Sequence, residues 1–134
     1  MIVSACLELY PGDAEPLMRR ALEIRRKKRP AGHPDILDAM SKLGEVLLAE
    51  KKAEALPLLE EALAGIEHSN ESTASDRADA RFWVARARVE LGVARAGALE
   101  LAQSSCQALA GPDYRDDMAT CRAWLAAHSG AARH

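Results

Sequence analysis

The apolar residues of this chain recur at the spacing of helices. Residues 14–28 carry a wide apolar stripe that comprises Leu17, Met18, Ala21, Leu22 and Ile24. From about Asp35 a second set is spaced by four, three and four residues, at Ile36, Met40, Leu43 and Leu47. A third set is spaced by three, four and three, at Leu56, Leu59, Leu63 and Ile66. These spacings put apolar side chains on one helix face and predict three helices.

The second half of the chain predicts three more helices. Residues 68–77 are polar and lack an apolar period, so they predict an exposed loop, with Ser75 or Asp76 expected to cap the next helix. That helix should end at Gly92, and two more should cover residues 94–110 and 117–128, followed by a frayed tail. A short helical piece is expected at residues 3–10.

Composition favours the same class. Of the 134 residues 49% are apolar but only 4% aromatic, and Ala and Leu outnumber the β-branched residues, which predicts an all-α domain. The formal net charge of −2 argues against a global footprint for nucleic acid, and no apolar run approaches the roughly 20 residues of a membrane span. No membrane association is expected.

Three cysteines, Cys6, Cys106 and Cys121, form an odd set without a CxxC pair. This pattern is untypical of a secreted disulfide framework and favours a reducing compartment, so we expect a cytoplasmic protein whose cysteines are small core residues.

An internal repeat predicts how the helices are organised. The segment 16–22 (PLMRRAL) recurs 41 residues later as 57–63 (PLLEEAL), and residues 98–102 form a weaker third copy. A helix pair repeated at this period is typical of an α-solenoid of antiparallel helix pairs. We expect a single domain over residues 1–134, with a partial first repeat at 1–28, repeats at 35–69 and 77–110, and a capping helix at 117–128.

The repeated residues carry a family resemblance. The segments 14–26 (AEPLMRRALEIRR), 32–35 (GHPD) and 56–63 (LPLLEEAL) resemble tetratricopeptide repeats of the kinesin light chain type. Residues 80–88, 92–102 and 123–128 are similar to the last repeat and capping helix of bacterial signalling proteins that carry such repeats. The resemblance implies a right-handed solenoid that binds proteins. This chain departs from the family at 51–53 (KKA), where a shorter turn replaces the usual Gly-Tyr, and at Ser41 and Lys42, which replace paired asparagines.

The resemblance also implies a ligand face. In this repeat class the first helix of each pair lines a concave groove, which nominates Asp38, Ser41, Lys42, Glu45, Asp79, Phe82, Arg86 and Glu90 as peptide-binding residues. The alternative is that these residues are the solvated face of amphipathic helices. Phe82, together with Trp83 and Trp124, is also well explained as core.

A basic run stands out between residues 19 and 29. It comprises Arg19, Arg20, Arg25, Arg26, Lys27, Lys28 and Arg29, with one acid among them. One interpretation is a solvated helix end, where cations interact favourably with the helix dipole and with the eight acids of residues 35–67. The other is a docking patch for an acidic partner. Nucleic acid is the weaker choice because few aromatic residues remain for base stacking.

No catalytic or metal-binding pattern is present in the sequence. The histidines, His33, His68, His128 and His134, lack ligand spacing, and neither a nucleophile motif nor a phosphate-binding loop occurs. We therefore expect no enzyme, no metal and no cofactor.

The expected function is a protein-protein interaction module, an adaptor or scaffold that binds a peptide or partner helix in its groove. The alternative is an oligomerisation or structural segment of a larger signalling protein. A homodimer through the N-terminal half-repeat is a specific hypothesis, because residues 3–10 are too short to cover the face of Leu17 and Leu22.

Overall fold

The computed structural model describes residues 11–93, 95–108 and 115–132. Within these ranges the chain forms six α-helices and no strand, which confirms the all-α prediction. The chain divides into two compact units, Met1–Ser72 and Thr73–His134, and the boundary lies within the polar segment 68–77. The helical piece predicted at residues 3–10 lies outside the described residues. None of the described helices is long and apolar enough to span a bilayer.

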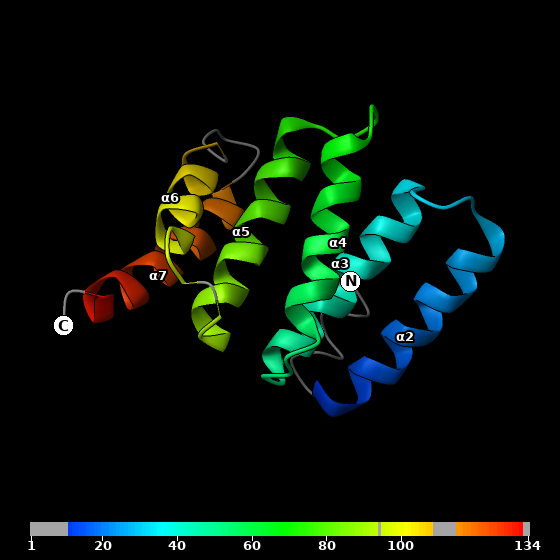
Figure 1. Ribbon diagram of the computed structural model, residues 1–134, viewed down its shortest axis with the longest axis horizontal. Helices are drawn as coiled ribbons and strands as arrows, with labels where there is room; N and C mark the ends of the chain where they lie inside the picture. The colour runs from blue at the N-terminus through cyan, green and yellow to red at the C-terminus, as the bar shows by residue number, and fades with distance from the viewer. Residues whose placement is uncertain (1–10, 94, 109–114, 133–134) are drawn as a thin grey trace. The chain divides into compact units, whose positions relative to one another are not determined.

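Unit 1 is an up-down-up arrangement of α2 (Pro11–Lys28), α3 (Pro34–Ala49) and α4 (Ala55–His68), with α3 packed against both neighbours (Figure 1). The prediction placed these helices at 14–28, from 35 and around 56–66, so it was correct in number and nearly correct in extent. α3 contributes the largest share of the core, through Ile36, Leu37, Ala39, Met40, Leu43, Val46, Leu47 and Leu48.

The shortened KKA segment, residues 51–53, forms the turn that ends α3 and reverses the chain toward α4. Lys51 adopts a left-handed conformation with φ of 59°. Its N–H donates to Leu48 O and the next N–H, from Lys52, donates to Leu47 O, both over 2.9 Å. This is the Schellman arrangement that ends many helices, with a lysine where glycine is usual. The chain thereby reverses within residues 50–54, so α4 starts directly against α3.

Two glycines let α3 and α4 approach closely. A Cβ added at Gly44 of α3 would lie 2.6 Å from Leu59 Cγ of α4, and one at Gly65 of α4 would overlap the end of the Leu37 side chain of α3. Each helix therefore accepts a leucine of the other at a position without a side chain.

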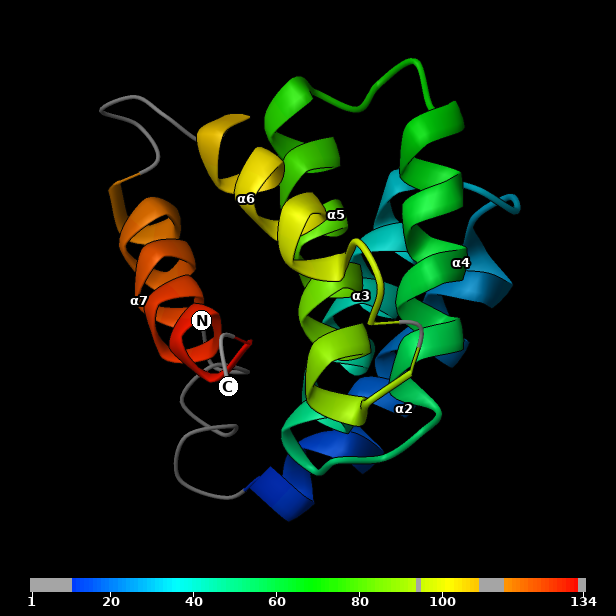
Figure 2. The same cartoon turned by 60° about the vertical axis from the view of Figure 1, so that its left-hand side comes forward.

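Unit 2 contains α5 (Ala74–Leu91), α6 (Ala98–Ala108) and α7 (Arg115–Ala132), which Figure 2 shows from the side. The cap prediction was wrong: Thr73 caps α5, and its Oγ1 accepts from Asp76 N–H while the Asp76 carboxylate accepts from Thr73 N–H. This reciprocal box satisfies more donors than a cap at residue 75 or 76 would. The predicted end at Gly92 is confirmed, with φ of 69°.

The two later helices also differ in extent from the prediction. α6 begins at Ala98 and not at residue 94, because Gly97 has φ of 75°, outside the right-handed helical region. α7 is longer than the predicted 117–128 and continues through residues expected to fray.

The core of unit 2 joins all three of its helices. It is formed by Phe82, Ala85, Val89, Ala98, Ala102, Cys106, Cys121 and Trp124. The rings of Phe82 and Trp124 meet edge to face with centroids 5.6 Å apart.

Cys106 of α6 and Cys121 of α7 form a disulfide. Both residues are buried as predicted, but the prediction of reduced cysteines is wrong for this pair. The packing of α7 on α6 brings their Cα atoms to 5.8 Å, a distance suited to a disulfide that a sequence separation of 15 does not reveal. The cysteines therefore no longer support the expectation of a reducing compartment.

Candidate protein-interaction surface

The residues nominated on α3 share one face of that helix. Asp38 and Lys42 are exposed, whereas Ser41 and Glu45 are half-buried. Their charges are already engaged within unit 1: Asp38 Oδ2 accepts from Arg25 Nη1 at 3.2 Å, and Lys42 Nζ lies 4.0 Å from Glu45 Oε2. The structure thus brings these four together as a surface whose charged groups have intramolecular partners.

The residues nominated on α5 are largely structural. Phe82 is only 3% exposed and belongs to the core of unit 2, so its nomination as a ligand-facing residue is corrected in favour of the core interpretation. Arg86 Nε donates to Glu90 Oε2 at 2.6 Å, and its guanidinium lies 4.8 Å from the Trp83 ring centroid. Asp79 is half-buried. This part of the nominated face holds unit 2 together and offers little free surface.

The basic run on α2 is divided between paired and unpaired cations. Arg19 pairs with Glu15 and Glu54, Lys27 with Glu23, Arg25 with Asp38, and Arg29 with Asp35. Arg20, Arg26 and Lys28 have no partner among the described residues. The expected neutralisation by the acids of residues 35–67 thus reaches Arg19, Arg25 and Arg29 and leaves three cations unmatched.

Ion pairs also shift pKa values where α2 meets the α3–α4 turn. The Lys52 ammonium, which contacts Glu15, is the main cause of a lowered pKa of that carboxyl group, and Arg19 adds to the effect. Glu15 and Glu50 in turn raise the pKa of Lys52. Hydrogen bonds to Glu54 and Glu15 raise the pKa of Arg19. These groups remain charged near neutrality and fix the start of α2 on the turn.

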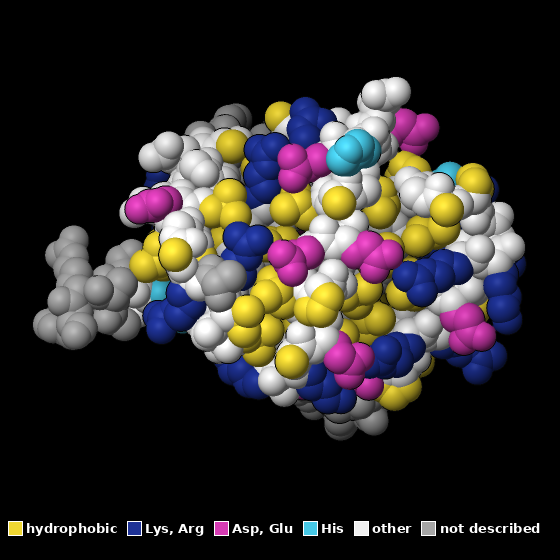
Figure 3. Space-filling view, in the orientation of Figure 1, with side chains coloured by type: hydrophobic (Ala, Val, Ile, Leu, Met, Phe, Trp, Pro, Cys, Tyr) yellow, Lys and Arg dark blue, Asp and Glu magenta, His cyan; other side chains and the backbone are white. Residues whose placement is uncertain are grey.

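A groove in unit 1 lies beside α3 and is formed by two hollows. The first, of about 340 Å³, is lined by Arg19, Leu22, Glu23, Arg26, Lys27 and Leu43. The second, of about 430 Å³, is lined by Arg26, Ala31, Gly32, Ile36, Leu37, Met40, Glu61 and Gly65. We call the two together the unit 1 groove. Figure 3 shows apolar side chains in the hollow between α2 and α4, with basic groups toward α2 and acidic groups toward α4.

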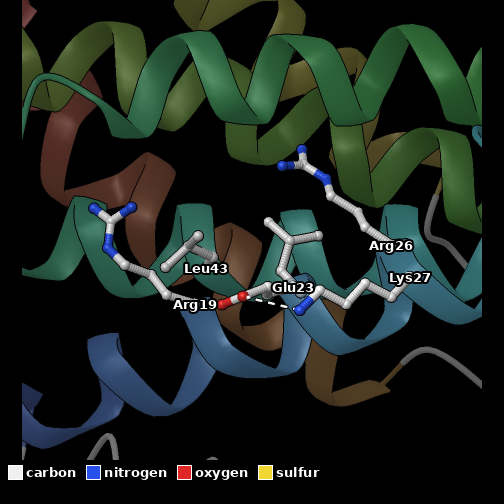
Figure 4. Close-up of a pocket in the computed structure, with 6 residues that line it drawn as sticks. Arg19, Glu23, Arg26, Lys27 and Leu43 are labelled. Atoms are coloured by element: carbon white, nitrogen blue, oxygen red, sulfur yellow. Dashed lines mark hydrogen bonds and ion pairs between the residues drawn. The ribbon is translucent and has the colours of Figure 1, made fainter.

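Arg26 is the residue that the two hollows share. In Figure 4 it extends from α2 away from the Glu23–Lys27 ion pair, and the Arg19 and Arg26 guanidinium groups stand on either side of Leu43. Across the second hollow, Glu61 of α4 is exposed and also lacks a partner among the described residues. The groove therefore combines an apolar floor with a cation and an anion, Arg26 and Glu61, that have no partner in the part of the chain that the structure describes.

Sequence reasoning included Arg26 in the basic run but missed the other half of the groove. Glu61 looks like any exposed glutamate on an amphipathic helix, and Ile36, Leu37 and Met40 have the spacing of ordinary core residues. The small residues Gly32 and Gly65 also line the second hollow. A single sequence does not show that Gly65 lies where the Leu37 side chain of α3 packs on α4.

The described residues contain no group of three or more His, Cys, Asp or Glu side chains arranged to hold a metal ion. No protein-family model, no curated protein and no solved structure matches the chain.

Proposed function

We propose that this chain is a non-catalytic protein-interaction module that binds a peptide segment of a partner in the unit 1 groove. The observation that carries the proposal is the position of Arg26, which lies in both hollows beside an apolar floor and has no partner among the residues that the structure describes. An unpaired guanidinium at the edge of an apolar hollow offers a charge-assisted, two-pronged hydrogen bond to a carboxylate.

The groove also indicates the form of the peptide. An apolar side chain of the ligand would cover Ile36 and Met40, an acidic group would meet Arg26, and a cationic or donor group would meet Glu61. A few polar contacts around an apolar floor are typical of specific binding sites. The α3 face with Asp38, Ser41, Lys42 and Glu45 remains a second candidate surface, but its charged groups would have to exchange present partners for a ligand.

The proposal includes a tetratricopeptide-like scaffold of antiparallel helix pairs. Two findings support it: α3 packs with α4 and α5 packs with α6, which are the pairs expected from the predicted repeats. In such arrays each pair is a recognition unit that contacts its neighbours in sequence.

Peptide display tests the proposal. The whole chain would be used to select from a random peptide library, and the affinities of selected peptides would be measured for wild type, Arg26→Glu and Glu61→Lys. Arg95→Glu in unit 2 is the matched control, because Arg95 is also exposed and without a described partner. We expect each groove variant to weaken binding about tenfold or more, as for loss of one charge-assisted contact, and the control to bind like wild type.

Two results would contradict the proposal. One is a selection that yields no peptide above background. The other is a set of peptides whose affinity is the same for Arg26→Glu and wild type, with helicity by circular dichroism unchanged in both. Selected peptides should also carry an acidic residue next to an apolar one.

The alternative function, self-association of the N-terminal half, has one observation in its favour. Leu17 is 53% exposed and Ile24 is 43% exposed on α2. Leu22, in contrast, is buried, so the uncovered face predicted from Leu17 and Leu22 is in fact centred on Leu17 and Ile24. Sedimentation equilibrium of wild type against Ile24→Asp tests this alternative.

A further inference from the structure

The outer side of α2 carries an exposed apolar stripe that does not belong to the unit 1 groove. Leu17 and Ile24 are among the exposed large apolar residues of the described chain, and the half-buried Ala21 lies between them. The spacing of four and three residues is that of alternating d and a positions in a coiled coil, with Lys28 at the next a position. We call Leu17, Ala21, Ile24 and Lys28 the α2 seam.

The charges along the α2 seam are positive; Arg25 and Lys27 have acidic partners within unit 1, in Asp38 and Glu23, and the other two cations have none within the described ranges. Arg20 and Lys27 occupy the g positions beside it, and Arg25 occupies an e position. Arg20 and Lys28 have no partner among the described residues, and the ion pair of Lys27 with Glu23 is exposed and 3.4 Å long. Over its whole length α2 carries six Lys and Arg against three Asp and Glu.

These charges disfavour the seam of a second copy as the partner. In a parallel self-pair the g cation Arg20 would face the e cation Arg25, and in an antiparallel self-pair Arg20 and Lys27 would face each other. The acidic helix α4 of a second copy is also unsuitable. Its exposed positions include Glu60, Glu61 and Glu67, but its exposed apolar residues, Pro57 and Ala64, are small, and the larger Leu63 and Ile66 are half-buried, so α4 offers a poor match to a seam built around Leu17 and Ile24.

We propose that the α2 seam docks an amphipathic helix of another protein whose apolar seam is flanked by Asp or Glu. Such a helix would cover Leu17 and Ile24 and would place carboxylates against Arg20 and Lys28. The apolar contact supplies affinity, and the flanking charges select the partner. None of the four seam residues lines either hollow of the unit 1 groove, although the flanking Lys27 lines the first hollow.

Two synthetic helical peptides of about three heptads test the proposal. Both carry Leu at a and d; one carries Glu at e and g and the other carries Lys. Binding to the whole chain is measured by fluorescence anisotropy for wild type, Ile24→Asp and Arg20→Glu. The controls are Val93→Asp and Arg95→Glu, because Val93 is 49% exposed and both residues lie in unit 2. Circular dichroism checks that each variant folds.

We expect wild type to bind the Glu peptide at least about tenfold more tightly than the Lys peptide, with the difference reduced at high salt. Ile24→Asp should lower the affinity for the Glu peptide about tenfold or more. Arg20→Glu should reduce or reverse the preference for the Glu peptide over the Lys peptide. Both control variants should bind the two peptides as wild type does. Equal binding of the two peptides, or equal binding by Ile24→Asp and wild type, would overturn the proposal. A dimer in sedimentation experiments that Ile24→Asp dissociates would identify a second copy as the occupant and would also overturn it.

Discussion

The indole of Trp124 donates a hydrogen bond of 2.9 Å from Nε1 to Glu90 Oε2, and so connects α7 to α5 across 34 residues of sequence. The same oxygen accepts from Arg86 Nε at 2.6 Å. The Trp124 ring also packs against Phe82 and stacks on His128 with centroids 4.3 Å apart. Glu90 therefore acts as a structural acceptor that fixes α7 on α5, although the sequence placed it on a ligand face.

Replacing Trp124 by Phe tests this connection. The substitution keeps an aromatic ring against Phe82 but removes the donor to Glu90, so we expect unit 2 to lose about 1–2 kcal/mol of unfolding free energy. Urea denaturation followed by the fluorescence of the remaining Trp83 measures it, because both tryptophans lie in unit 2. Glu100→Gln, at an exposed carboxylate of α6, should change little. An unaltered urea midpoint in Trp124→Phe would show that the hydrogen bond contributes nothing.

The disulfide between Cys106 and Cys121 makes a second prediction. It closes a loop with a sequence separation of 15, for which the loss of chain entropy in the unfolded state corresponds to about 3 kcal/mol. We expect Cys121→Ser, or a reductant added to wild type, to destabilise unit 2 by up to about this amount. The reductant should have no further effect on Cys121→Ser.

Thiol titration gives the control for that prediction. In a Cys6→Ser background the denatured, non-reduced chain should react with no thiol reagent, and after reduction both remaining cysteines should react. Full reactivity before reduction, in protein prepared without reductant, would contradict the assigned disulfide.

Much of the helical arrangement was predictable from the sequence, because it follows from local rules. The apolar spacing located α3 and α4 within a few residues. Gly92 marked the end of α5 because glycine readily adopts the left-handed backbone conformation that commonly ends a helix. The starts of α5 and α6 were missed by the same local reasoning. Several polar residues compete for one cap near Thr73, and the left-handed Gly97 looks like any other glycine.

The candidate site was less predictable, because it depends on which side chains meet. Sequence spacing placed Glu90 and Lys42 on the predicted ligand-facing sides of their helices. Only tertiary packing shows that Glu90 accepts a hydrogen bond from Trp124. The basic run was visible in the sequence, but the sequence does not show that Arg19 pairs with Glu15 and Glu54 while Arg26 has no partner among the described residues. The disulfide was missed for the same reason.

The close contact between α3 and α4 makes a third prediction. Alanine normally stabilises a helix interior relative to glycine by about 1 kcal/mol. At Gly44 the added Cβ would lie 2.6 Å from Leu59 Cγ, so we expect Gly44→Ala to destabilise unit 1 by about 1–3 kcal/mol instead. Far-UV circular dichroism during urea unfolding measures the change.

A double variant separates steric overlap from other effects of Gly44→Ala. In a Leu59→Ala background the obstructing side chain is absent, so Gly44→Ala should cost much less there than in wild type. If the two substitutions are additive, the close approach of Gly44 and Leu59 does not limit the packing of these helices.

The ion pairs of Glu15 make the stability of unit 1 depend on pH. Lys52 and, secondarily, Arg19 lower the pKa of Glu15 in the folded chain. A carboxyl group whose folded pKa is lowered contributes stability above its ordinary value near 4.5, and this contribution is lost as the pH falls through the folded pKa. Lys52 and Arg19 have raised pKa values, so they stay protonated throughout this acidic range.

Glu15→Gln should therefore destabilise unit 1 near neutral pH and lose its effect in acid. Urea midpoints from far-UV circular dichroism, recorded from about pH 7 to about pH 3, should show wild type above Glu15→Gln at the neutral end and the two curves converging at the acidic end. Glu61→Gln is the matched control, because the Glu61 carboxylate has no partner among the described residues and its removal should leave the wild-type profile unchanged. The difference should also shrink with added salt, because these pairs are at the surface. A difference between wild type and Glu15→Gln that stays constant across the range would mean that the carboxylate charge is not what attaches α2 to the α3–α4 turn.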